Sequence, residues 1–136
     1  MRVLMVEPGM APYEKEINGL AEMKAAVGGS ITASYPFKEP VALVSNDESI
    51  WLKMPFNRSV EGGYGGIFGP FFVCGLSEDS FCSLTPEQIA RYQAKHHQAE
   101  ILLAVHGSEV ETLAWLTLTL MMLSAPATVH TAPPQV

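Results

Sequence analysis

The sequence predicts an α+β fold, a small and mostly antiparallel sheet with helices packed on one side, followed by an apolar C-terminal helix. Two observations predict it. Short apolar runs ended by Pro, Gly or Asn alternate with stretches of helical spacing. The chain has 136 residues, of which 48% are hydrophobic and 16% charged, which suits one folded domain. We expect this domain to span residues 1–124, with a core at 1–107.

The elements of the first half follow from periodicity and from turn residues. Residues 14–27 place apolar side chains three or four positions apart, which is typical of a helix, and Gly28-Gly29 ends it. In chain order the pattern predicts a strand at 2–7, this helix, a half-buried strand at 30–35 and a hairpin at 41–52.

The second half begins with a strand at 67–74, interrupted by Gly69-Pro70. Thr85-Pro86-Glu87-Gln88 has the pattern of a capping box with proline at the first helical position, so a helix should run from there to about Val105. A last helix is expected at 108–124 and a disordered tail at 125–136.

Charge and composition exclude several classes of function. The net charge is −6 and the eight basic residues are scattered, which argues against direct nucleic-acid binding. The longest apolar segment covers about 14 residues, whereas a membrane span needs about 20. The two cysteines match no zinc spacing. We therefore expect a cytoplasmic protein with no membrane association, no metal and no cofactor.

The glycine-rich stretch GGYGGIFGPFFVCG, residues 62–75, does not match the P-loop, because Pro70 and Phe71 follow Gly69 where a P-loop has Lys and Ser or Thr. It does not match the dinucleotide fingerprint either, because the glycines fit no register of it and lead into a strand rather than a helix. Two interpretations stay open. The stretch is a connection into a buried strand, or the amides of Gly63 and Gly65 form an anion-binding nest with Tyr64 stacked on a base.

Asn57-Arg58 is the second candidate for binding. A guanidinium suits phosphate and an amide can read a donor-acceptor edge, but a structural role is equally compatible with the sequence. The predicted ligand-binding set also contains Tyr13, which follows the first strand, and Asn46, which lies in the turn of the hairpin predicted at 41–52.

Catalytic patterns are weak. His96 and His97 are adjacent on a predicted helix and point in different directions, as expected for a solvated helix face. Cys74 lies in an apolar strand, where a thiol is usually inert, and no histidine is placed beside Cys82. We expect no catalytic residues and a protein that is not an enzyme, with a phosphodiesterase or nucleotide hydrolase as the remaining alternative.

The last predicted helix is apolar on nearly every face and must be buried. In so small a chain a second copy can supply that burial, so we expect a homo-oligomer with Trp115, Leu116, Leu120 and Met121 at the interface.

The segments RVLMVEPGMAPYEKEI, YPFKEPVALVSNDE, PFNR and FGPFFVCGLSEDSFCSLT resemble a domain family of unknown function that occurs in bacteriophages and conjugative elements of gut Firmicutes. The resemblance covers about residues 1–100. Pro70 stands where that family usually has threonine, and residues 108–136 lie outside its pattern. The family has no established activity, and the resemblance implies only a setting, small proteins often encoded near counter-defence genes.

This setting leads to two hypotheses. The first is a phage or mobile-element counter-defence protein that sequesters a small phosphorylated nucleotide signal of host immunity. In it Arg58 pairs a phosphate, Asn57 reads a base or ribose, and the glycine amides close over the ligand. The alternative is an inhibitor that binds a host defence protein, such as a nuclease or a CRISPR or restriction component.

Overall fold

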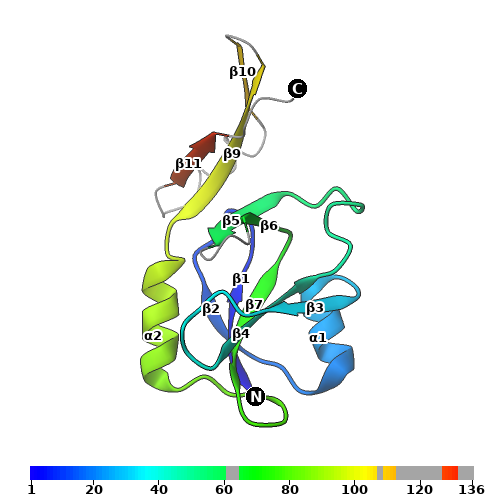
Figure 1. Cartoon of the computed structure of the whole chain (residues 1–136), viewed down its shortest axis with the longest axis vertical. Helices are drawn as coiled ribbons and strands as arrows, with labels where there is room; N and C mark the ends of the chain where they lie inside the picture. The colour runs from blue at the N-terminus through cyan, green and yellow to red at the C-terminus, as the bar shows by residue number, and fades with distance from the viewer. Residues whose placement is uncertain (61–64, 107–108, 113–126, 132–136) are drawn as a thin grey trace.

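The computed structural model of the chain describes residues 1–60, 65–106, 109–112 and 127–131. Its centre is an antiparallel sheet in the order β2-β1-β7-β4-β3, with β8 added beside β7 (Figure 1). These strands are β1 (Arg2–Val6), β2 (Tyr13–Glu16), β3 (Ile31–Ser34), β4 (Val41–Asn46), β7 (Phe71–Leu76) and β8 (Phe81–Cys82).

The two helices cover opposite faces of this sheet. α2 (Pro86–Lys95) packs through Ile89 and Tyr92 on the face that carries Leu4 and Val73. α1 (Gly19–Val27) packs on the other face, where Val27 meets side chains such as Phe72. The prediction of helices on one side is therefore wrong, although the α+β class and the mostly antiparallel sheet are confirmed.

The register explains why both faces need a helix. Leu4 and Leu43 lie opposite Val73 on one face, and Met5 lies opposite Phe72 on the other. Strands that are buried on both faces read as continuous apolar runs rather than alternating ones. The runs RVLMV, VALV and FFVC carried this signal.

α1 begins later than predicted. Residues 13–16 form β2, which pairs antiparallel with β1 from Tyr13 opposite Met5 to Glu16 opposite Arg2. Ile17 is buried before the helix starts, and Leu20 is 56% exposed. The predicted end is confirmed, because Gly28 is the C-cap residue with a left-handed φ of 79°.

α2 begins as predicted and ends early. The Thr85 hydroxyl accepts from the Gln88 amide at 3.1 Å, and the Gln88 side chain accepts from the Thr85 amide at 2.9 Å. The helix stops at Lys95, and residues Ala99–His106 form strand β9 instead of the last predicted turns. An apolar run such as EILLAV fits either a helix or a strand.

The hairpin predicted at 41–52 and the strand predicted at 67–74 need correction. Residues 48–53, expected in part as the returning strand of a hairpin, form a hydrogen-bonded turn. The strand predicted at 67–74 is divided at Gly69, whose φ is 79°, into β6 (Gly65–Phe68) and β7. β6 pairs antiparallel with β5 (Phe56–Val60) rather than with the central sheet.

At the C-terminal end the structure differs from the predicted helix and tail. β10 (Glu109–Thr112) pairs antiparallel with β9, and β11 (Ala127–Thr131) pairs parallel with β9. The first residues of the predicted helix are thus a strand, as is part of the predicted tail. The four predicted interface residues, Trp115, Leu116, Leu120 and Met121, lie outside the described residues.

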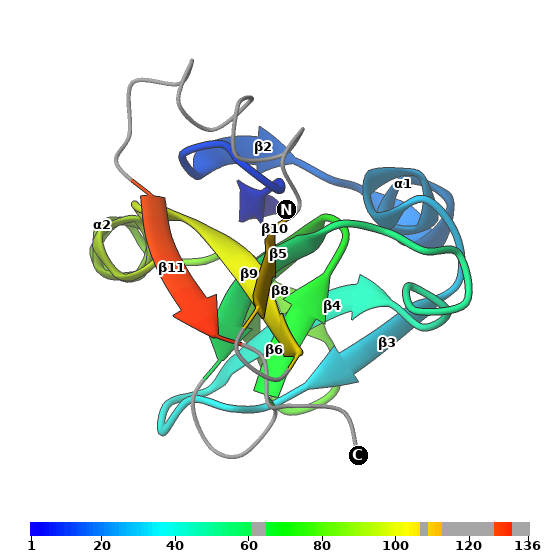
Figure 2. The same ribbon diagram turned by 90° about the horizontal axis from the view of Figure 1, so that it is seen from above.

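Two small sheets, β5-β6 and β10-β9-β11, lie over one end of the central sheet. At this end β5, β6 and the start of β9 meet the end of α2 (Figures 1 and 2). Ser59 of β5 binds Glu100 of β9, which joins the two small sheets. This end of the molecule holds Asn57 and Arg58, which the sequence singled out.

Candidate functional site

Arg58 is fully buried, and its guanidinium is engaged entirely by oxygens of the protein. Nε and Nη2 both donate to the carbonyl oxygen of His96, at 3.2 and 3.0 Å, and Nη2 also donates to the carbonyl of Met10 at 2.6 Å. Nη1 donates to the backbone and side-chain oxygens of Asn57, at 3.2 and 2.9 Å. These bonds match the five N–H donors that a guanidinium has.

The electrostatic surroundings of Arg58 agree with a structural role. Burial lowers the pKa of Arg58 to about 10, and the negative charge of Glu100 acts in the opposite direction. His96 is the C-cap residue of α2, where a cation is favoured by the helix dipole. Arg58 therefore caps α2, and the structure gives it a different place from the predicted phosphate contact.

Asn57 is likewise fully buried. Its Nδ2 donates to the carbonyls of Val6 and Gly69, both at 2.9 Å, while its Oδ1 accepts from Arg58. The side chain ties β1, the Gly69 corner and β5 together. Both amide hydrogens of Asn57 are thus used inside the fold, so its side chain has a different place from the predicted base or ribose contact.

The other predicted ligand residues do not converge on one site. The Tyr13 hydroxyl donates to Glu7 at 2.7 Å. Asn46 is buried and donates to the carbonyl of Val27, at the end of α1. Gly65 is the first residue of β6 and pairs with Val60. Gly63 and Tyr64 lie outside the described residues.

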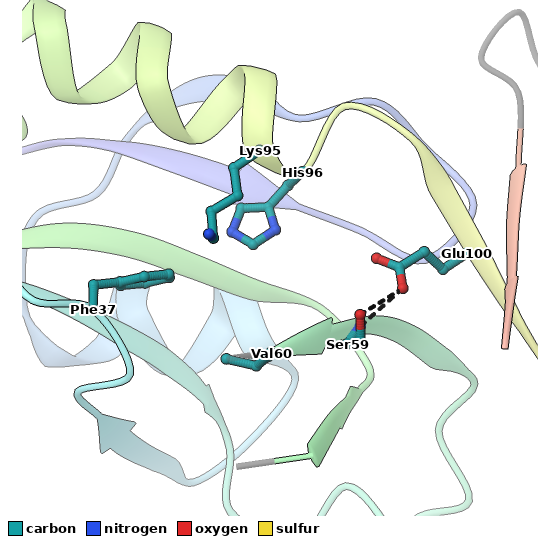
Figure 3. A pocket seen from close by; sticks show the side chains of 6 residues that line it. All are labelled: Phe37, Ser59, Val60, Lys95, His96 and Glu100. Atoms are coloured by element: carbon teal, nitrogen blue, oxygen red, sulfur yellow. Dashed lines mark hydrogen bonds between the residues drawn. The ribbon is translucent and has the colours of Figure 1, made fainter. Parts of the chain in front are cut away.

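A pocket of about 230 Å³ lies beside His96, whose carbonyl binds Arg58, and we call it the α2–β5 pocket (Figure 3). It is lined by Phe37 from the β3–β4 connection, Ser59 and Val60 of β5, Lys95 and His96 at the end of α2, and Glu100 of β9. Figure 3 shows Phe37 at one end of this pocket and Ser59 with Glu100 at the other.

The polar end of the α2–β5 pocket holds a carboxylate. Oε1 of Glu100 accepts from the Ser59 amide at 3.1 Å and from the Ser59 hydroxyl at 2.8 Å. The two donors converge on one oxygen, as in sites that bind carboxylate or phosphate. The Glu100 carboxylate also interacts electrostatically with the buried Arg58 guanidinium, so a buried positive charge acts on this end of the pocket.

The aromatic end combines a ring with a cation. Nζ of Lys95 lies 5.8 Å from the centre of the Phe37 ring, within the range of a cation–π contact. The Phe37 ring also contacts Tyr92, at 4.7 Å between ring centres, and His96, at 6.3 Å. The pocket thus offers an apolar wall and a positive charge within one short span.

Sequence reasoning missed most of these residues. His96 is only 3% exposed and lies edge-on to Phe71, so the expected solvated face applies to His97 alone. Phe37, Lys95 and Glu100 come from three segments that only the fold brings together. The available signal was Phe37, an aromatic residue in a proline-bounded connection, where binding residues are frequent.

Two further observations concern metal binding and membrane crossing. Among the described residues, no group of three His, Cys, Asp or Glu side chains is arranged to hold a metal ion. Of the helices in the described part of the chain, neither is long and apolar enough to cross a membrane.

Comparison with known protein families gave a match over most of the chain. The family model described as a domain of unknown function (DUF3846) matches residues 1–97, which include every lining residue of the α2–β5 pocket except Glu100. No curated protein and no solved structure matches the chain.

Proposed function

Starting from the fact that the chain belongs to the domain family of unknown function DUF3846, we propose that it binds a small phosphorylated ligand in the α2–β5 pocket and acts by sequestering it. The ligand class is a nucleotide. The proposal retains the nucleotide-binding hypothesis and moves the site from Arg58 and the glycine stretch to Phe37, Ser59 and Lys95.

The observation that carries the proposal is the carboxylate of Glu100 held by both donors of Ser59. A pocket that places an N–H and an O–H on one anionic oxygen has donors suited to a phosphate oxygen. In this proposal Glu100 occupies the anion position when no ligand is bound, and the phosphate displaces it. Lys95 then supplies the charge that the ligand pairs with.

The aromatic end supports a nucleotide over inorganic phosphate. Phe37 offers apolar surface at the end of the pocket away from Ser59, and Val60 adds apolar surface between the two (Figure 3). A base lies against this surface while its phosphate reaches Ser59. The volume of about 230 Å³ is below the roughly 300–1,000 Å³ of pockets for drug-sized ligands, which favours a single nucleotide unit.

The biological setting is proposed with the binding. A small protein of a mobile element that retains a nucleotide stoichiometrically would lower the concentration of a host immune messenger. We propose this counter-defence role, in the cytoplasm of the host cell, for the chain. It requires tight binding and intact release of the ligand rather than turnover.

The test is native mass spectrometry of the purified chain with a panel of cyclic nucleotides and ADP-ribose derivatives. We expect one ligand mass per pocket, released intact on denaturation. Lys95→Ala should weaken binding of that ligand by roughly 10- to 150-fold, since one charge-assisted contact is worth about 1.5–3 kcal/mol. Ser59→Ala removes the hydroxyl donor and should weaken it as well.

Lys15→Ala is the matched control, because Lys15 is an exposed lysine of β2 that does not line the pocket. Its affinity should equal that of the unmodified chain. Retention of no compound from the panel would overturn the nucleotide proposal and favour the inhibitor of a host defence protein. Release of a cleaved product would contradict sequestration and indicate an enzyme.

A further inference from the structure

The turn between β4 and β5 exposes three consecutive large apolar side chains, which we call the apolar turn. Ile50 is 74% exposed, Trp51 86% and Leu52 54%. Single exposed apolar residues are common on protein surfaces, but a contiguous group marks an interaction site more often. Tryptophan is also one of the residue types enriched among those that dominate binding energy.

The apolar turn is held in one conformation by its backbone. The Leu52 amide donates to the Glu48 carbonyl at 2.9 Å, and the Met54 amide donates to the Ser49 carbonyl at 3.0 Å. At its start, the Glu48 amide donates to Oδ1 of Asn46 at 2.7 Å, and Asn46 is itself bound to the end of α1. A turn fixed in this way loses little conformational entropy when it binds.

Acidic side chains lie next to the apolar turn. Asp47 and Glu48 precede it and are exposed, and Lys53, also exposed, follows it. The turn thus presents apolar side chains with two negative charges at its entry. A complementary surface is apolar with basic residues along its border.

The same chain carries such a surface on α2. A groove of about 640 Å³ lies between α2 and the β3–β4 connection, and we call it the α2 groove. Phe37 and Tyr92 form its aromatic part, with ring centres 4.7 Å apart. Lys38, Arg91 and Lys95 also line it, three of the eight basic residues of the sequence.

Part of this positive charge is already balanced. Arg91 pairs with Glu39, which also accepts from Gln88 at 3.1 Å. Lys38 is exposed in the same connection, beyond this pair. Lys38 is therefore the cation best placed to meet an acidic partner without disturbing the Arg91 pair.

The apolar turn cannot reach the α2 groove of its own molecule. In both views the β4–β5 connection lies on the side of the main sheet opposite to α2 (Figures 1 and 2). We propose that the apolar turn of one copy docks in the α2 groove of a second copy, with Asp47 and Glu48 facing Lys38. This contact joins two different surfaces, so repetition of it closes a ring or extends a filament.

The α2 groove shares Phe37 and Lys95 with the α2–β5 pocket, but the two surfaces are otherwise lined by different residues. Self-association and ligand binding are therefore separable by substitution. Lys38 lines only the groove, and Ser59 lines only the pocket.

Sedimentation velocity over a concentration series tests the proposal. The full chain should associate with increasing concentration, and Trp51→Ser should raise the dissociation constant at least thirtyfold, the effect of losing a dominant interface residue. Leu20→Ser is the control, because Leu20 is a 56% exposed apolar residue of α1 outside the turn, and it should leave association unchanged.

A charge exchange tests which surface receives the turn. Glu48→Lys and Lys38→Glu should each weaken association, and the double variant should recover part of it. Circular dichroism verifies that each variant is folded. A chain that stays monomeric at every concentration overturns the proposal, and so does association that persists in Trp51→Ser. Retained nucleotide binding by Lys38→Glu separates a failure of this contact from a failure of the pocket.

Discussion

Oδ1 of Asn57 accepts a hydrogen bond from Nη1 of its neighbour Arg58 at 2.9 Å, and this bond holds the guanidinium against the end of α2. Asn57 is fixed in turn by the carbonyls of Val6 and Gly69. The pair thus links β1, β5, the Gly69 corner and α2 through buried polar contacts. Because buried polar groups are stabilising only when satisfied, each member depends on the others.

Substitution of Arg58 by lysine should destabilise the protein by about 3 kcal/mol, since an ammonium has three donors where the guanidinium uses five. Urea unfolding followed by circular dichroism measures the loss. Arg2→Lys is the control, because the Arg2 side chain is half exposed and forms long surface pairs with Glu14 and Glu16. Full stability of Arg58→Lys with loss of nucleotide binding would return Arg58 to a ligand role.

Substitution of Glu100 by glutamine should raise the affinity for a phosphorylated ligand, by about five- to tenfold. The change removes a negative charge from the polar end of the α2–β5 pocket and keeps an acceptor for Ser59. Isothermal titration calorimetry with the ligand identified by mass spectrometry measures the effect. Glu87→Gln, an exposed change in the first turn of α2, should have none. Weaker binding by Glu100→Gln would mean that the carboxylate contacts the ligand directly.

Tyr13 and Tyr92 should ionise at a higher pH than an ordinary tyrosine. Burial is the main cause that raises the pKa of both Tyr13 and Tyr92 to about 12, and the carboxylates of Glu7 and Glu39 add to it. Because the folded-state pKa lies above the ordinary value of 10.0, the stability they contribute is complete below pH 10 and is lost between about pH 10 and 12. Absorbance titration at alkaline pH measures their ionisation.

Tyr13→Phe should remove the ionisation of Tyr13 above pH 10 and leave that of Tyr92. The stability of this variant should also fall less steeply with rising pH than that of the unmodified chain. Ionisation of every tyrosine near pH 10 in the folded chain would contradict the burial of these two hydroxyls.

The two thiols should react at very different rates. Burial raises the pKa of Cys74 to about 12, whereas Cys82 lies half-buried in β8. Because the thiolate is the reactive form, a thiol reagent at pH 8 should modify Cys82 first and Cys74 only on unfolding. Cys82→Ser should abolish the fast phase, and a fast phase that survives it would show that β7 opens readily.

Local signals in the sequence predicted the elements that depend on local chemistry. The capping box at Thr85 and Gln88 and the glycine end of α1 at Gly28 are both present. Each is decided by residues within one helical turn. The apolar runs of β1, β4 and β7 were also identified, because short β-branched runs bounded by turn residues are typical of strands.

Long-range contacts explain what the sequence did not reveal. β2 is a strand because it pairs with β1, and its composition alone favours no such partner. The side chain of Arg58 could equally face solvent or the core, and only the carbonyls of Met10 and His96 decide this. The α2–β5 pocket combines Phe37, Ser59 and Glu100, whose distance along the chain hides their proximity.

The central place of β7 has a consequence for synthesis on the ribosome. β1 and β4 both pair with β7, and β1 emerges first although its partner spans Phe71–Leu76. Until that segment leaves the exit tunnel, β1 is an apolar strand that has one of its two neighbours, β2, but lacks the other. Sheets whose strands are distant in sequence form slowly, and their unpaired strand edges are prone to aggregation until they have formed. Translation speed between β4 and β7 should therefore govern how much of the newly made protein reaches its native state.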